Sequence, residues 1–266
     1  MTAPLLRTLR AIALAPPLYV LLGLLGAVSL GWNLIAAVLY PLLPPAIGRK
    51  LGRATIAHVY RAFWALASAC RMMRVDAACL DPLQDEPGLI FVANHPTMLD
   101  ALLLVAHLPR SACIMKASLM RNVFLGTGAR LARYIRNDSA RTMVRLAVED
   151  LRAGGQLVIF PEGTRTTEWP LNHFRPGVTL IAKRANAPIQ TVFLDTDTPY
   201  LGKGWPIWRV PPLPIVFRLR LGERFAPAQD SDAQLAHIEH YFRQHTEARS
   251  PDAQAACSTP RAPTLS

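Results

Sequence analysis

A long apolar run near the N-terminus is the first feature of the hydrophobic pattern. Residues 11–48 contain no charged side chain, and the proline-free part at 18–40, LYVLLGLLGAVSLGWNLIAAVLY, predicts a helix. The run is long enough to cross a bilayer, which needs about 20 apolar residues. Basic residues flank it on both sides, so the positive-inside rule assigns no orientation: Arg7, Arg10, Arg49, Lys50 and Arg53.

Three interpretations of this run are open. A secretory signal peptide would use Arg7 and Arg10 as its basic start, but its apolar part is usually only about 7–15 residues long. A re-entrant hairpin would enter and leave by one membrane face, and would bend at small or polar residues: Gly23, Gly26, Gly31 and Asn33. We favour an anchor, and expect residues 1–48 to be a membrane-anchoring or re-entrant helical segment.

Helical and strand patterns follow one another through the rest of the chain. Residues 49–74 have apolar positions at spacings of three and four, which predicts a helix that lies either on an anionic membrane surface or in the core. Apolar runs predict strands at 88–94, 112–117, 156–162, 189–195 and 213–221. Helices are predicted at 98–107, 118–132, 140–153, 176–185 and 230–247.

This alternation predicts an α/β domain over residues 49–249, with a mostly buried mixed sheet flanked by helices. Residues 250–266 are small, polar and proline-bearing, so they predict a disordered tail.

Charge and cysteine usage narrow the function classes. The net charge is +11 and arginine supplies most of the positive charge, which favours an acidic partner such as a membrane face, an acidic carrier protein, a phosphorylated substrate or nucleic acid. Nucleic acid is disfavoured because no nucleic-acid motif is present and the aromatic residues fall mostly in apolar stretches. The four cysteines form no C-x-x-C pair, so we expect no metal site, no disulfide framework and a reducing compartment.

The stretch ANHPTMLDA at 93–101 holds the first candidate chemistry. In one interpretation Thr97 is an N-cap that accepts the N–H of Asp100, and Asp100 only favours the helix dipole. In the other, His95 is a general base that Asp100 orients. Five residues of a continuous helix rotate through about 500°, so the two side chains would point well apart. They can meet only if His95 precedes the helix. Pro96 favours such a turn, and the two interpretations are compatible.

A second candidate stretch, LVIFPEGTRT, occupies residues 157–166. A buried strand is predicted to end at Phe160, which places Glu162, Gly163, Thr164 and Arg165 at its carboxyl end, where α/β sheets bind ligands. An acid and an arginine there could hold a polar substrate through charge-assisted hydrogen bonds. The alternative is a local Glu162–Arg165 ion pair on an exposed loop, which would contribute little stability.

Together, NHPTMLD and FPEGTR resemble the glycerolipid acyltransferase family, the 1-acyl-glycerol-3-phosphate acyltransferases and their relatives, which carry H-x4-D and then E-G-T-R. The resemblance covers residues 75–195. Softer similarities are Lys116 in IMKASL, the HFRPGV turn with Phe174, Arg175 and Gly177, and APIQTV, where Thr191 replaces a usual proline.

The resemblance implies an α/β acyltransferase with His95 as general base and Asp100 as its partner. An acceptor hydroxyl must lose a proton as it attacks a thioester, and imidazole can take a proton near neutral pH. The implied donor is an acyl carrier protein or coenzyme A thioester, and the implied acceptor is a membrane lipid. No metal or cofactor is implied. The implied location is the cytoplasmic face of a membrane, the inner membrane if the source is bacterial.

Substrate binding is expected from Lys116, Arg136 and Arg175 and from the motif at 162–165. For a carrier protein, electrostatic steering by Arg121, Arg130 and Arg133 is expected. The oxyanion donor is open between backbone N–H groups near Pro96 and near Gly163.

The acceptor is less defined, because the stretch ARYIRNDSART at 132–142 departs from the family. Relatives with a phosphate acceptor tend to have a glycine where Arg133 stands and a final arginine near Asn137 and Asp138. Arg136 or Arg141 could replace that arginine, since a carboxylate would repel a phosphate. The acceptor is therefore either a lysophospholipid such as lysophosphatidate, or one without a terminal phosphate, such as a lyso-aminolipid or another hydroxylated acyl compound. A basic nucleic-acid-binding protein and an inactive membrane-tethered scaffold are remote alternatives.

Overall fold

A computed structural model describes residues 3–247, with side chains from Leu14 onward. The expected tail at 250–266 lies outside this range. In the described part, seven strands form one sheet in the order β1-β7-β6-β2-β5-β3-β4. All neighbouring strands are parallel except β6 and β7, so the sheet is mixed, as predicted. The strands are β1 (Met73–Asp76), β2 (Ile90–Ala93), β3 (Ser111–Met115), β4 (Ile135–Arg136), β5 (Gln156–Ile159), β6 (Ile189–Thr196) and β7 (Ile215–Phe225).

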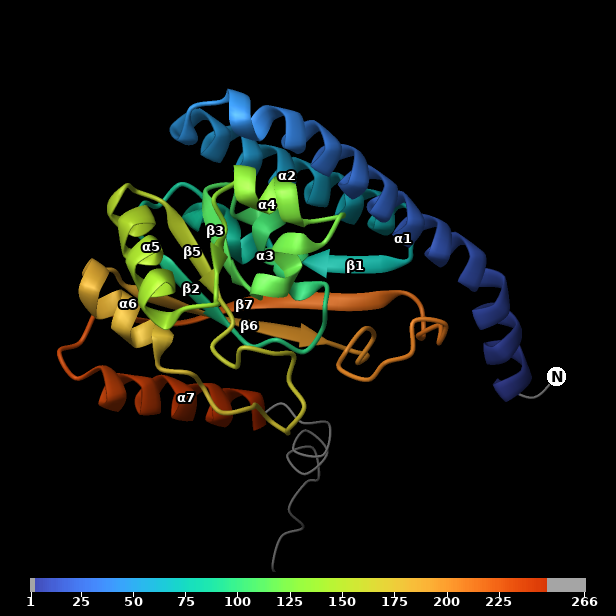
Figure 1. Ribbon diagram of the computed structural model, residues 1–266. Helices are drawn as coiled ribbons and strands as arrows, with labels where there is room; N and C mark the ends of the chain where they lie inside the picture. The colour runs from blue at the N-terminus through green and yellow to red at the C-terminus, as the bar shows by residue number, and fades with distance from the viewer. Residues whose placement is uncertain (1–2, 248–266) are drawn as a thin grey trace, which may run out of the picture.

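Helices cover both faces of this sheet (Figure 1). The helices on one side are α1 (Ala3–Leu42), α2 (Pro45–Ala69), α3 (Asp100–His107) and α4 (Gly126–Leu131). Those packed on the other side are α5 (Ala140–Arg152), α6 (Gly177–Ala185) and α7 (Ser231–Glu247). Short 3-10 helices, η1 (Ala78–Leu83) and η2 (Ala117–Arg121), complete the order.

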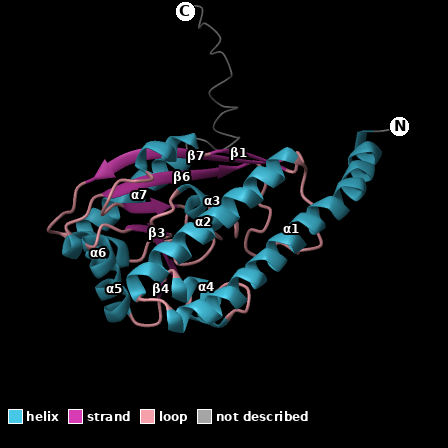
Figure 2. Ribbon diagram, turned by 90° about the horizontal axis from the view of Figure 1, so that it is seen from above, coloured by secondary structure: helices cyan, strands magenta, loops and turns pink. Residues whose placement is uncertain are grey.

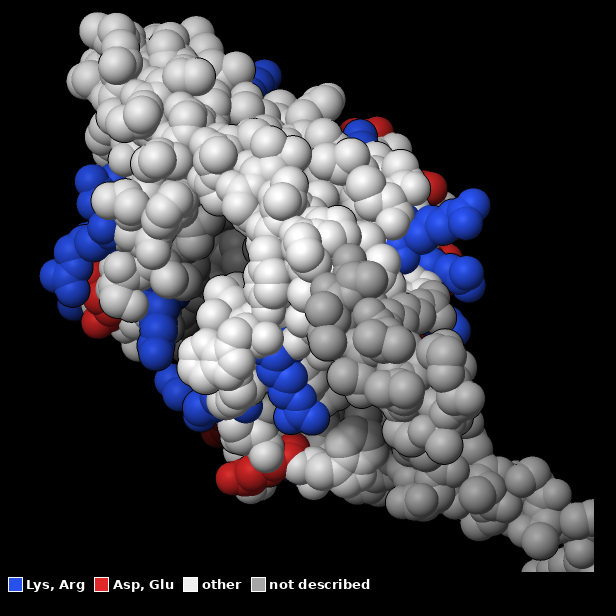
Figure 3. Space-filling view, turned by 90° about the vertical axis from the view of Figure 1, so that its right-hand side faces the viewer, with Lys and Arg blue, Asp and Glu red and all other residues white. Residues whose placement is uncertain are grey.

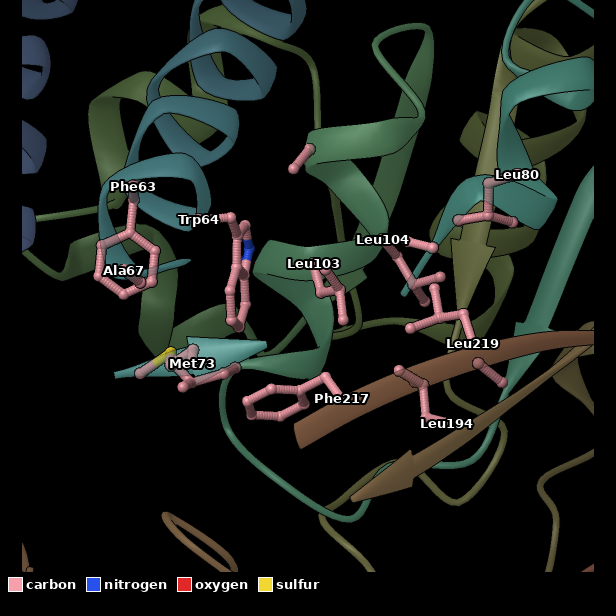
Figure 4. Close-up of a cluster of buried hydrophobic side chains, with 14 of the residues drawn as sticks. Phe63, Trp64, Ala67, Met73, Leu80, Leu103, Leu104, Leu194, Phe217 and Leu219 are labelled. Atoms are coloured by element: carbon pink, nitrogen blue, oxygen red, sulfur yellow. The ribbon is translucent and has the colours of Figure 1, made fainter. Parts of the chain in front are cut away.

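The central strands are buried on both faces, which explains why their sequences read as continuous apolar runs. Along β2, Phe91 and Ala93 belong to the core beneath α2 and α3, whereas Ile90 and Val92 belong to the core beneath α5, α6 and α7. This alternation follows from the two-residue period of a strand. In the first core, Trp64 packs edge-on against Phe63 and Phe217, with ring centroids 5.4 and 5.1 Å apart (Figure 4).

The N-terminal helices form an antiparallel pair (Figure 2). α1 runs without interruption through the glycines and Asn33, so the re-entrant bend expected at those residues is wrong. The chain reverses instead at Leu43–Pro44, and Pro45 begins α2, where a missing N–H costs nothing. One helix in the described residues, spanning Leu14–Leu42, is long and apolar enough to cross a membrane by length and composition.

Two predicted helices have wrong limits. The helix expected at 49–74 ends at Ala69, and residues 73–74 start β1, a short edge strand that its polar sequence did not indicate. The helix expected at 118–132 is η2 followed by a separate α4. Gly126 approaches the carbonyl of Met120 so closely that an added Cβ would clash with it, which matches a break between the two elements.

Candidate active site

His95 lies in the loop between β2 and α3, and its backbone is fixed from both sides. Its N–H donates to Oε1 of Glu162 at 3.0 Å, and its carbonyl accepts the N–H of Thr166 at 2.8 Å. The preceding Asn94 pairs reciprocally with the backbone of Leu194 on β6, at 2.9 and 2.7 Å. The imidazole stacks on Phe160, with ring centroids 4.1 Å apart and planes 21° apart. These contacts fix the position and tilt of the ring.

The imidazole contacts a buried carboxylate. Nδ1 of His95 lies 2.9 Å from Oδ2 of Asp100, the first residue of α3, whose side chain is 1% exposed. A carboxylate only accepts hydrogen bonds, so this contact places the hydrogen on Nδ1 and leaves the lone pair of Nε2 for a substrate. His95 therefore precedes the helix and meets Asp100 across the turn, as the sequence predicted.

Thr97 positions Asp100, but not by the predicted N-cap. The N–H of Thr97 donates to Oδ2 of Asp100 at 2.7 Å, and its hydroxyl donates to Oδ1 at 2.5 Å. That hydroxyl accepts the N–H of Leu99 at 3.2 Å rather than the N–H of Asp100. The N-cap position of α3 is Leu99, without a side-chain cap. The carboxylate is thus held by three donors, which restrict it to one orientation.

The E-G-T-R motif lies in the loop between β5 and α6 and contacts the loops that follow β2 and β6. Its acid and its base have different partners. Oε1 of Glu162 also accepts the hydroxyl of Thr166 at 2.8 Å, and Oε2 accepts the N–H of Asn172 at 3.0 Å. Arg165 donates to the carbonyls of Leu201 and Gly202 at 2.8 and 3.1 Å. The local Glu162–Arg165 ion pair is therefore not formed. Burial raises the pKa of the Glu162 carboxyl above its usual value, although hydrogen bonds from Asn172, Thr166 and His95 oppose that shift.

The backbone at position 163 requires a glycine. Its φ is +69°, and an added Cβ would lie 2.6 Å from Nε of Arg175. The predicted substrate residue Arg175 therefore packs over the motif's backbone, outside the two cavities described below. Two of the backbone N–H groups near the predicted oxyanion positions are already engaged: that of Gly163 donates to the carbonyl of Phe160 at 3.0 Å, and that of Thr97, next to Pro96, donates to Asp100.

His95 lines a cavity of about 440 Å³, within the range of small-molecule sites. We call it the apolar cavity. Its walls come from α1, α2, α3, α4 and the ends of β3 and β5, and the predicted residues Lys116, Gly163, Thr164 and Arg165 also line it. Of the described lining residues none is Asp or Glu, and Lys116 and Arg165 are the cations. No sequence pattern indicated that Trp32, Tyr60 and Tyr134 share this wall, because they are far apart along the chain.

Arg136, the remaining predicted substrate residue, faces elsewhere. It forms an ion pair with Asp138 at 2.9 Å and lines a neighbouring, arginine-rich cavity instead of the apolar one.

Comparison with known proteins adds to this geometry. Residues 74–195, which contain both motifs, match the sequence profile of the family described as Acyltransferase. The chain carries an acyltransferase-family domain. A relative is human lysophosphatidylcholine acyltransferase 1, which is 30% identical over 165 aligned residues; the match covers 58% of this chain and 29% of the human protein. The match thus spans less than a third of that relative's length.

The acyltransferase domain and the helices around it also resemble a solved structure. The crystal structure of the 1-acyl-sn-glycerophosphate (LPA) acyltransferase PlsC from Thermotoga maritima matches with a TM-score of 0.66, over 96% of this chain and 100% of that chain. Sequence identity is 19%, so this match establishes the α/β fold.

Proposed function

We propose that this acyltransferase moves a fatty acyl group from an acyl thioester to a hydroxyl of a membrane lysophospholipid, with His95 as general base. The observation that carries the proposal is the Nδ1–Asp100 contact of a histidine on the wall of an apolar cavity. Such a cavity suits a fatty chain, and the lone pair of Nε2 suits proton abstraction from a hydroxyl.

The reaction balances without a covalent enzyme intermediate. The acceptor hydroxyl gives its proton to Nε2 of His95 as its oxygen attacks the thioester carbonyl carbon. The tetrahedral intermediate then collapses, the carbon–sulfur bond breaks, and the leaving thiolate takes a proton from the imidazolium. Asp100 stabilises that imidazolium and holds the ring's orientation. Lys116 and Arg165 bring positive charge to the same cavity, where oxyanion charge and acceptor phosphate need it.

The charges around the cavity favour a phosphate-bearing acceptor such as 1-acyl-glycerol-3-phosphate. Lys116 and Arg165 line it, and Asp138, the acid that favoured an amine-bearing acceptor, lines the other cavity and pairs with Arg136. An acceptor screen with one acyl donor tests this point. If the protein acylated lyso-aminolipids but neither lysophosphatidate nor any other phosphate-bearing lipid, the assignment would be reversed.

Membrane association is supported by α1, whose outer face is apolar and open. Val20, Leu34, Val38 and Leu42 on this helix are 62–70% exposed, and a continuous apolar surface of this kind marks an interaction site. The side of the molecule to which α1 extends has a wide area without charged side chains and a hollow, with Lys and Arg at its margins (Figure 3).

We place the active site on the cytoplasmic face, the inner membrane if the source is bacterial, because activated acyl groups are made there. Protease protection in intact cells, compared with inverted vesicles, tests the side.

Replacement of the base tests the function directly. We expect His95→Ala to lower turnover by about 10²–10⁴-fold, the usual contribution of general-base catalysis. The measurement is thiol release from the acyl thioester by full-length protein in vesicles, with lysophosphatidate as acceptor. His58→Ala is the matched control, because His58 is an exposed histidine on α2 that bonds only to the carbonyl of Ala54. Near-normal turnover of folded His95→Ala protein would refute the general-base role.

A further inference from the structure

A second cavity, about 1140 Å³, lies beside the apolar cavity and is rich in arginine. We call it the arginine cavity. Its walls come from the α1–α2 turn, from η2 and α4, and from β4 and α5. Three acids and six arginines line it, an excess of three positive charges: Arg49, Arg121, Arg130, Arg133, Arg136 and Arg145. Positive charge concentrated in a concave site attracts anions.

Half of these arginines have an acidic partner and half do not. Arg49, Arg136 and Arg145 pair with Asp150, Asp138 and Glu149 at 3.1, 2.9 and 2.8 Å. Arg130 donates to the neutral carbonyl of Met120 at 2.8 Å, and Arg133 lies 5.4 Å from the ring centroid of Tyr40. Within residues 14–246 no acid pairs with Arg121, Arg130 or Arg133. These three guanidinium groups are available to an anionic ligand.

The two cavities share a wall. Tyr134 lines both. Lys116 and Asn137 line the apolar cavity, while their chain neighbours Ala117, Arg136 and Asp138 line the arginine cavity. An elongated ligand that follows residues 116–117 and 136–138 would have one end among the arginines and the other in the cavity of His95.

We propose that the arginine cavity binds the phosphate groups of the acyl donor, so that the thioester at the other end of its pantetheine arm enters the apolar cavity. The inference rests on the proposed function, which requires a donor with a phosphorylated carrier. A guanidinium group can bind a phosphate through two parallel N–H···O hydrogen bonds, and it binds more strongly than a neutral donor does. Coenzyme A and acyl carrier protein share the phosphorylated pantetheine arm, so this chemistry covers both sources of the acyl group.

Donor kinetics of arginine variants test the proposal. Full-length Arg121→Gln, Arg133→Gln and the double variant are assayed with acyl coenzyme A, with acyl carrier protein and with an acyl pantetheine thioester that lacks phosphate. We expect each substitution to raise the KM for a phosphorylated donor about tenfold, the loss of one charge-assisted hydrogen bond. The kcat, the acceptor KM and the KM for the unphosphorylated thioester should stay within about twofold. Arg184→Gln is the matched control, because Arg184 is exposed on α6 and lines neither cavity.

Each outcome decides the question. A rise in the KM for a phosphorylated donor supports the site, and the donor whose KM rises identifies the carrier. An equal rise with the unphosphorylated thioester, or a rise in the acceptor KM alone, overturns it. So does weaker sedimentation with anionic phospholipid vesicles at unchanged donor KM, which would mean that the cavity binds a lipid headgroup.

Equilibrium binding separates this inference from the proposed function. Coenzyme A and phosphopantetheine-bearing carrier protein are titrated into His95→Ala protein, with and without Arg121→Gln and Arg133→Gln. Binding that depends on the arginines supports the cavity even if His95 proves dispensable for turnover. Binding that the double variant leaves unchanged refutes the cavity even if His95 proves essential.

Discussion

Asp100→Asn isolates what the charge of the carboxylate contributes, because an amide can keep most of its hydrogen bonds. With its carbonyl oxygen in the place of Oδ2, asparagine still accepts the N–H of Thr97 and Nδ1–H of His95, which Asp100 binds at 2.7 and 2.9 Å. Its NH₂ group then faces the hydroxyl of Thr97, which has a second lone pair beside the one that accepts the Leu99 N–H. We expect the variant to fold, with a free energy of unfolding within about 1 kcal/mol of wild type.

The magnitude of the activity loss follows from the lost ionic contact. A hydrogen bond to a charged group contributes about 1.5–3 kcal/mol, and 1.36 kcal/mol in the barrier is a factor of ten in rate. The kcat should therefore fall about 10- to 150-fold, less than for His95→Ala. Both KM values should change little, because Asp100 is buried and does not line the apolar cavity.

The assay is thiol release in vesicles, at saturating donor and acceptor, with thermal unfolding in parallel. Thr97→Ser is the control, because serine keeps the N–H and the hydroxyl that hold Asp100. A folded Asp100→Asn protein whose kcat stays within twofold of wild type would refute the positioning role of the carboxylate.

Two further predictions concern the E-G-T-R motif. Burial raises the pKa of Glu162, so the folded state disfavours its ionised form, and this group's contribution to stability is fully present below its unfolded pKa and is lost as pH rises through the folded pKa. Glu162→Gln loses one of the acceptors but does not titrate, so it should destabilise the protein more at pH 4 than at pH 7. Melting curves of both proteins across this range would contradict the reasoning if the difference in melting temperature widened with pH. Gly163→Ala should lower the melting temperature by more than Gly204→Ala. Both positions have φ above +60°, where an alanine costs about 1–2 kcal/mol, but only at Gly163 does the added Cβ meet another side chain. Equal losses in melting temperature would mean that Arg175 moves away freely.

The parts of the fold that could be predicted are those that local pattern determines. Apolar runs located β2, β3, β5, β6 and β7. The runs are continuous in the central parallel strands β2 and β5, because both of their faces are buried. The strands β1 and β4 were missed, because four and two residues at a sheet edge carry too little pattern. Pro96 and the five-residue spacing allowed a His95–Asp100 contact, and the resemblance to the glycerolipid acyltransferases predicted it.

Long-range partners account for what the sequence could not show in the site. Glu162 suggested either a substrate contact or a local ion pair, yet it accepts the backbone N–H of His95, 67 residues away. The arginine cavity combines residues from the α1–α2 turn with residues of α5 about 100 positions later, as in the Arg49–Asp150 pair. Such sites depend on how helices pack across the sheet, and neither periodicity nor charge count contains that information.

The same packing makes the N-terminal helix part of the site, in addition to its proposed role as an anchor. Ser29, Trp32 and Asn33 line the apolar cavity. Asn33 is 5% exposed, donates to the carbonyl of Phe124 and accepts the N–H of Gly128 at 2.8 Å, so it joins α1 to α4 and to the segment that precedes α4. A polar side chain buried in an apolar helix is costly unless such bonds satisfy it. Because the opposite face of α1 exposes large apolar side chains, the proposed contact with a bilayer and the closure of the apolar cavity would depend on one and the same helix. The position of that helix in a membrane would then bear directly on the geometry around His95.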